Sequence, residues 1–199
     1  PGGSVDGPSI TAVDLKTIQS QKRRPWTTVL RESGKNGEVA LVKAARHAVD
    51  AKTRLFGMFG VKKGHLPFQT ADGGFDPTIS AGAAVGNLST TVAAEKYSQA
   101  DIDENPTLAE MTNAALMVLS ARADRFWLMV EAGDVDWANH ANNIDNSIGA
   151  VLSGDSAFKS VTDWVETNGG WEDTAVFVTA DHGHYFVLEK PEALISVPQ

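Results

Sequence analysis

Residues 126–131 have the sequence FWLMVE, in which five consecutive apolar side chains are followed by a carboxylate. A short run that is apolar on both faces is typical of a strand buried in a parallel sheet. Residues 174–179, TAVFVT, form a second run of this kind, and residues 54–59, RLFGMF, form a third that ends at Gly60. The three segments therefore predict buried strands.

Helical patterns lie between these strands. Residues 39–52 are rich in Ala and carry an apolar stripe, and residues 108–121 follow Thr107, a predicted N-cap with Glu110 three positions later. A helical stretch follows residue 130, breaks near Gly154 and resumes over 156–166. Because helices and strands alternate, we expect an α/β fold with a mostly parallel, doubly wound sheet.

The remaining segments have weaker patterns. Residues 1–10 are turn formers and predict a frayed terminus. Residues 14–31 are polar and basic, and Pro25 would break a helix there. The chain therefore divides into a polar segment with one helix (1–53) and the main part of a domain (54–199), with a loop-rich insertion at about 65–103.

The composition is that of a globular protein, with 42% apolar and 21% charged residues. The net charge of −8 argues against a nucleic-acid partner, because binding a phosphate backbone requires a basic face. No apolar stretch approaches 18 residues, so no membrane span is predicted. The chain has no Cys, and a metal would have to bind His, Asp and Glu.

Three of the five histidines lie in two short segments, each at the end of a predicted strand. Residues 130–140 have the sequence VEAGDVDWANH, and residues 179–184 have the sequence TADHGH. In open α/β sheets, ligands bind at the carboxyl ends of strands. The position of both segments therefore favours a site.

The residue types also suit a metal. Asp136 and His140 are four apart, which places both on one face of a helix. Asp181 and His182 are adjacent in a tight turn, and Glu131 offers the hard oxygen that magnesium prefers. Each feature alone has an ordinary structural explanation, such as a surface pair or a salt-bridged strand end. Together, in this order on successive strands, they predict a metal site.

The two motifs, VEAGDVD-x-x-x-H and VTADHGH, resemble those of the alkaline phosphatase family. The similarity extends over roughly residues 54–188 and includes the segment PTLAEMT at 106–112. Related phosphoglycerate mutases and sulfatases share the late Asp-His pair but not Glu131. The resemblance implies a three-layer αβα fold, of which this chain would be the C-terminal, metal-binding portion.

The resemblance also implies roles for individual residues. It assigns Asp136 and His140 to one zinc, and Asp181 and His182 to a second zinc. Glu131 would bind magnesium. His184 would lie in the second shell and form a hydrogen bond to a zinc-bound carboxylate. In the family, two zinc ions hold a phosphate monoester, a serine takes the phosphoryl group, and the phosphoserine is then hydrolysed to release inorganic phosphate. The family resemblance further suggests a periplasmic or secreted location, and often a homodimer.

Some elements of the family pattern are missing. Nothing before residue 130 matches the Asp-Ser-Ala segment of the nucleophile, the phosphate-binding Arg cannot be assigned, and the family's third zinc-binding His is expected further downstream. Asp155-Ser156-Ala157 reproduces the tripeptide between the two metal motifs, where it predicts only a helix start with Asp155 as N-cap. Trp137 occupies a position near the phosphate where Lys or His is frequent.

We therefore expect a two-zinc, one-magnesium phosphomonoesterase whose nucleophile lies outside this chain, so that the chain alone is inactive. One alternative is a non-catalytic metal- or phosphate-binding protein. Another is a related phosphodiesterase or phosphomutase, against which Glu131 argues. His47, between apolar residues in a helix, and His65, at the start of a loop, are interpreted as structural.

Overall fold

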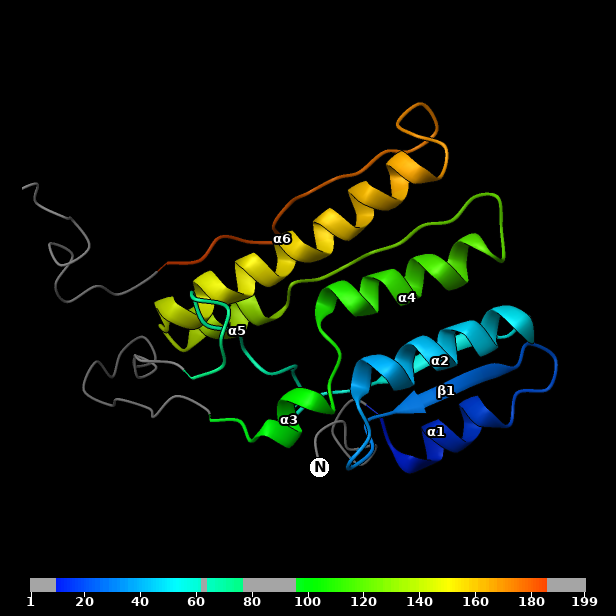
Figure 1. Ribbon diagram of the computed structural model, residues 1–199, viewed down its shortest axis with the longest axis horizontal. Helices are drawn as coiled ribbons and strands as arrows, with labels where there is room; N and C mark the ends of the chain where they lie inside the picture. The colour runs from blue at the N-terminus through cyan, green and yellow to red at the C-terminus, as the bar shows by residue number, and fades with distance from the viewer. Residues whose placement is uncertain (1–9, 62–63, 77–95, 186–199) are drawn as a thin grey trace, which may run out of the picture.

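A computed structural model describes residues 10–61, 64–76 and 96–185 of the chain. Three predictions lie outside these ranges: the frayed terminus at 1–9, the part of the insertion at 77–95, and a strand at 186–188. The elements, in chain order, are α1 (Ala12–Gln19), β1 (Trp26–Leu30), α2 (Gly37–Asp50), β2 (Arg54–Met58), α3 (Gln99–Asp103), α4 (Leu108–Ser120), α5 (Asp134–His140) and α6 (Ile144–Thr167) (Figure 1). The described part is thus helical, with a small parallel sheet.

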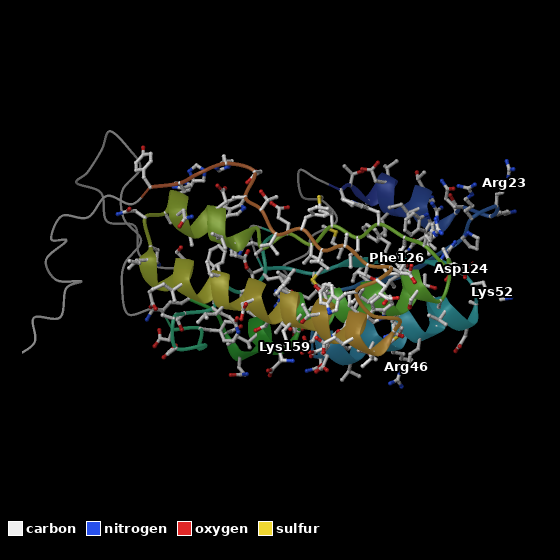
Figure 2. The ribbon with its side chains drawn as sticks, turned by 90° about the horizontal axis from the view of Figure 1, so that it is seen from above. Arg23, Arg46, Lys52, Asp124, Phe126 and Lys159 are labelled. Carbon is white, nitrogen blue, oxygen red and sulfur yellow. The ribbon has the colours of Figure 1, made fainter. Side chains whose placement is uncertain are left out.

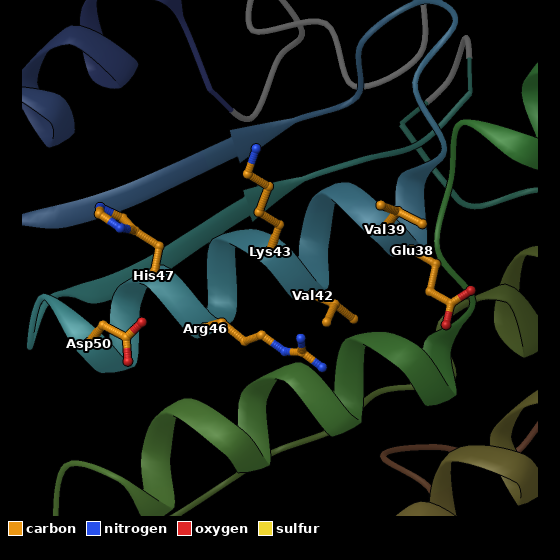
Figure 3. Close-up of a pocket in the computed structure, with 7 residues that line it drawn as sticks. All are labelled: Glu38, Val39, Val42, Lys43, Arg46, His47 and Asp50. Carbon is orange, nitrogen blue, oxygen red and sulfur yellow. The ribbon is translucent and has the colours of Figure 1, made fainter.

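The sheet consists of β1 and β2, which run parallel with Trp26 opposite Arg54 and Leu30 opposite Met58. Helix α2 connects the two strands and packs on them, and α1 contacts β1 from the other side (Figures 1 and 3). The strand predicted at 54–59 is confirmed. Pro25 lies between α1 and β1, so no helix runs through it, as the sequence predicts, whereas β1 itself was not predicted.

The hydrophobic core lies where α2 meets the sheet and α4. Its buried members are Leu41, Ala45, Ala48, Phe59, Ala114 and Val118. The predicted helix at 39–52 is observed as α2, and its N-cap Asn36 accepts a hydrogen bond from the backbone N–H of Val39 at 2.9 Å. The small Ala side chains allow the helices to approach closely.

Helix α4 begins as the sequence predicts. Thr107 Oγ1 accepts a hydrogen bond from the backbone N–H of Glu110, whose carboxylate accepts one from the Thr107 N–H at 2.7 Å. This reciprocal capping satisfies two amide groups that would otherwise lack partners at the helix end.

Helix α6 is continuous over 24 residues, so the predicted break near Gly154 is wrong, and its N-cap is Asn143 rather than Asp155. Gly154 lies inside this helix, and its lack of a Cβ leaves room for the Ala132 side chain, which a Cβ would approach to 3.0 Å. Ser156 lies inside the helix and donates its hydroxyl to the Leu152 carbonyl at 3.0 Å.

The apolar runs at 126–130 and 174–179 are extended but are not strands, contrary to prediction. A strand forms only when a neighbouring strand takes its backbone hydrogen bonds, and neither run has such a neighbour in the described part of the chain. In the first run Phe126, labelled in Figure 2, contacts Trp164 of α6 edge-on, with ring centroids 5.5 Å apart. The next residue, Trp127, is open to solvent and 81% exposed.

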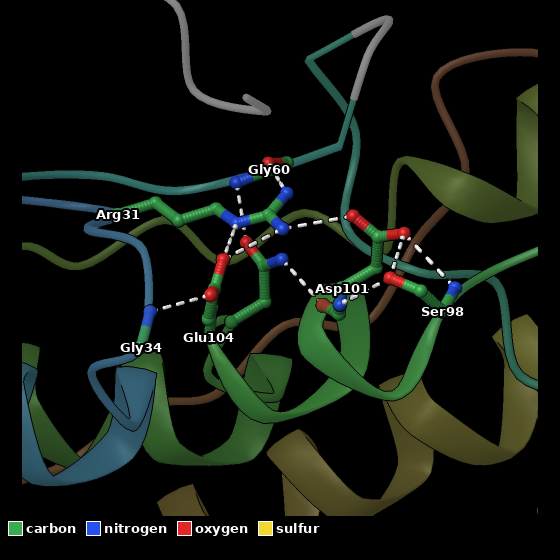
Figure 4. A network of polar contacts seen from close by, with 7 residues as sticks. Arg31, Gly34, Gly60, Ser98, Asp101 and Glu104 are labelled. Carbon is green, nitrogen blue, oxygen red and sulfur yellow. Dashed lines mark hydrogen bonds and ion pairs between the residues drawn. The ribbon is translucent and has the colours of Figure 1, made fainter.

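A buried ionic network joins β1 to α3 (Figure 4). The Arg31 guanidinium donates to Asp101 at 2.8 Å, to Glu104 at 3.0 Å and to the Gly60 carbonyl at 3.0 Å. The Arg31 side chain is 6% exposed. Helix α3 lies at the end of the insertion predicted to be loop-rich, and the sequence did not indicate this short helix.

Hydrogen bonds from the Ser98 backbone N–H and hydroxyl, together with Arg31, lower the pKa of Asp101 to about 2. In the described ranges no helix is both long enough and apolar enough to cross a membrane.

Candidate metal centre

Helix α5 carries the first predicted motif. It has seven residues, with Asp134 and Asp136 in its first turn and His140 in its last, an arrangement that suits the helix dipole. Asp136 Oδ2 and His140 Nε2 are 3.5 Å apart. The spacing of four residues therefore places both side chains on one face of the helix.

The extended segment that follows α6 returns the chain to α5 (Figure 1). His182 Nε2 lies 3.5 Å from Asp136 Oδ1. The His184 ring meets that of His140 at 4.8 Å, nearly perpendicular to it. The structure thus brings the histidines of the two motifs together around Asp136.

Three of these side chains could coordinate a single cation. The ligand atoms that Asp136, His140 and His184 can offer all lie within 4.8 Å of one another. Asp136 Oδ1 is buried and accepts no hydrogen bond among the described residues, although His182 Nε2 lies 3.5 Å from it. A buried carboxylate oxygen without a donor is unfavourable unless a cation or a donor pairs with it, so this atom fits a metal ligand.

The other predicted ligands lie at the edge of this cluster. The Asp181 side chain is 90% exposed, and its Oδ1 accepts a hydrogen bond from the backbone N–H of His182 at 3.0 Å. The pKa of His182 is raised, chiefly because its ring bonds the Gly183 carbonyl, and also through Asp181 and Asp136. Glu131 is exposed and is not a member of the three-residue group.

An aromatic group borders α5, and the sequence did not indicate it. His65 is 9% exposed, stacks on Phe68 with ring centroids 4.1 Å apart, and lies 6.1 Å from Trp137. Burial raises the pKa of Asp134 to about 6, and the charge of His65 opposes the rise. The one signal for Asp134 in the sequence was its position two residues before Asp136, a predicted ligand.

The exposed face of α2 has a shallow hollow lined by Glu38, Val39, Val42, Lys43, Arg46, His47 and Asp50 (Figure 3). All of these residues come from one helix. His47 is exposed. The hollow lies apart from α5 and is not part of the candidate centre.

A cluster of imidazole and carboxylate groups without thiolates is the kind of centre found in metal-dependent hydrolases, and the chain around it combines helices with a parallel strand pair. A family model described as alkaline phosphatase matches residues 84–193, more than half of the chain. The chain therefore belongs to the alkaline phosphatase family.

Individual relatives agree with this assignment. Alkaline phosphatase H of Pseudomonas aeruginosa is 31% identical over 151 residues, which cover 76% of this chain and 29% of the relative. The alkaline phosphatase of Escherichia coli is 36% identical over 90 residues, 45% of this chain and 18% of the relative. A membrane-bound alkaline phosphatase of Bombyx mori is 37% identical over 86 residues, 43% of this chain and 15% of the relative. The chain thus spans less than a third of the length of these relatives.

Proposed function

We propose that this chain is the C-terminal, metal-binding portion of a phosphatase that hydrolyses phosphate monoesters. The observation that carries the proposal is the convergence of Asp136, His140 and His184 around a buried carboxylate oxygen that lacks a hydrogen-bond donor. Membership of the alkaline phosphatase family supports the choice of reaction.

The donor set fits zinc, which prefers imidazole nitrogen and carboxylate oxygen when thiolates are absent. In the proposal, Asp136 and His140 hold one zinc, Asp181 and His182 hold a second, and Glu131 holds magnesium. When bound, such ions supply positive charge that stabilises the phosphate oxygens during transfer. Because the Asp181 side chain and Glu131 are exposed, they are free to turn toward a cation.

The residues of the chain itself position this centre. Helix α5 holds Asp136 and His140 on one face, and the returning segment places His182 and His184 against them. We expect His184 to orient Asp136 by a hydrogen bond, as its proposed second-shell role requires. Trp137 is 54% exposed beside Asp136 and lacks the charge with which Lys or His would attract phosphate, so phosphate release should be favoured.

The wider fold and the location belong to the same proposal. We infer a three-layer αβα arrangement, with β1 and β2 forming part of a larger doubly wound sheet that polypeptide beyond this chain would complete. The serine nucleophile outside the chain and a periplasmic or secreted location follow from the family resemblance, and the division at residue 53 follows from the sequence pattern. The chain alone should then bind metal and phosphate without turnover.

A zinc titration tests the proposal directly. The 199-residue chain should bind zinc, and Asp136→Ala should weaken binding by at least about 10-fold because it removes a central ligand. Asp163→Ala is the matched control, since Asp163 pairs with Lys159 on the exposed side of α6 and lies in neither motif. Equal zinc affinity for all three proteins would reject the metal centre.

The reaction class needs a second experiment on the protein encoded by the complete reading frame. We expect hydrolysis of 4-nitrophenyl phosphate to exceed that of bis(4-nitrophenyl) phosphate, and both to be lost on treatment with a chelator. A preference for the diester would point to a phosphodiesterase instead. Zinc binding without turnover of either ester would favour a non-catalytic metal-binding protein.

A further inference from the structure

The loop of residues 64–74 is fastened to the start of α6. Asn146 Nδ2 donates to the Gln69 carbonyl at 3.1 Å, and the backbone N–H of Ala71 donates to Asp145 Oδ1 at 2.9 Å. Gly149 passes so close to Gln69 that any Cβ on it would overlap the Gln69 carbonyl oxygen. The loop therefore has a fixed place on the helix that follows α5.

His65 is the residue through which this loop reaches α5. Its ring is buried and lies nearly parallel to that of Phe68, with an interplanar angle of 6°. Its Nδ1 is 2.6 Å from the Leu66 carbonyl oxygen, so the Nδ1–H donates there and sets the orientation of the ring. An imidazole held by a ring stack and a hydrogen bond to the backbone has little freedom to turn.

The His65 ring also lies near Trp137, the residue next to Asp136. The ring centroids of His65 and Trp137 are 6.1 Å apart, with an interplanar angle of 41°. Helix α5 has no side-chain N-cap, since Gly133 occupies that position. Its first turn therefore depends on contacts from outside the helix.

We propose that His65 is a positioning residue for the metal centre: through its ring contacts with Phe68 and Trp137, it holds the first turn of α5 against the 64–74 loop and thereby fixes Asp136. The expected effect of His65 on metal affinity rests on the proposed metal-binding function. The geometric part of the inference, the placement of Trp137 by His65, does not depend on any metal.

Fluorine NMR of the full chain labelled with 5-fluorotryptophan tests the geometric part without metal. The chain has five Trp, and Trp137→Phe identifies the signal of Trp137. In His65→Ala we expect that signal to shift and the other four to stay in place. His65→Phe, which keeps a ring in the stack, should restore the signal toward its original position, and His47→Ala, on the exposed face of α2, should change nothing.

Zinc affinity, measured on the same proteins, tests the consequence. His65→Ala should bind zinc about 10-fold more weakly than the unmodified chain, and His65→Phe should recover most of the loss. If His65→Ala does not fold, Phe68→Leu removes the stack more gently and should shift the Trp137 signal. An unmoved Trp137 signal in a folded His65→Ala or Phe68→Leu chain would overturn the inference, as would unchanged zinc affinity. Failure of the unmodified chain to bind zinc would instead reject the proposed function.

Discussion

The β1–α2–β2 unit and the two extended runs at 126–130 and 174–179 have similar apolar sequences and different structures. In the first, each strand has a parallel neighbour and α2 covers the pair. In the second, the backbone is extended, yet Met129 and Phe177 remain 79% and 78% exposed. The comparison shows that an apolar run specifies extended backbone, while a sheet also requires a partner for its hydrogen bonds.

The same contrast applies to polar groups. Arg31 is enclosed by three acceptors, and its network connects segments about seventy residues apart in the chain. The candidate metal ligands, by comparison, are held mostly by one another, and the His140 side chain is 69% exposed. The first region is buried and held by several hydrogen bonds, whereas the side chains of the second are largely exposed and contact chiefly one another.

Removing the centre of the buried network should have the largest effect on stability. Arg31→Ala leaves Glu104 without its cation in a buried position, and we expect a loss of about 3 kcal/mol in the free energy of unfolding, measured by urea denaturation. Lys35→Ala is the control, because the Lys35–Glu32 pair is exposed and should contribute under about 1 kcal/mol. Equal effects would show that the network is not buried in solution.

A pair of apolar substitutions compares the two regions directly. Leu41, which is 4% exposed, should lose about 3 kcal/mol of stability on replacement by Ala, because a cavity forms in the core. Phe177→Ala should change stability by only about 0.5 kcal/mol, since its side chain faces solvent. Thermal or urea unfolding of both variants measures the difference. A large loss for Phe177→Ala would mean that the run at 174–179 is packed after all.

The smallest expected effect is a loss of folding stability at low pH that depends on Asp101. Its pKa in the folded chain is about 2, below its ordinary value of 3.8, so its contribution to stability is complete above about pH 4 and disappears as the pH falls toward 2. Asp101→Asn should therefore be less stable than the unmodified chain at pH 7 and equal to it near pH 2. Unfolding measured across this range checks the prediction, and a constant difference at every pH would contradict it.

The features that the sequence predicted are those specified locally. The Thr107–Glu110 capping box and the Asp136–His140 spacing depend on residues within one helical turn, and β2 on a run of five residues. Helix α3 was missed because its sequence, QADID, is short and polar, and its place depends on Arg31 from a distant strand.

The contacts of the site were less predictable. The contact of His65 with Trp137 joins residues more than seventy positions apart, and no local pattern encodes it. The meeting of His182 with Asp136 could be expected only from the resemblance of both motifs to those of one family.

The length of helix α6 also sets how far the chain must return to reach α5. Its 24 residues extend about 36 Å at 1.5 Å per residue. The fourteen residues at 168–181, which begin with a turn, are enough to span that distance at roughly 3.3 Å per extended residue. The segment that follows α6 is therefore long enough to return along the whole helix, which is why His182 lies beside Asp136. Insertions in α6 should therefore be tolerated only when the return path lengthens too, by about half as many residues.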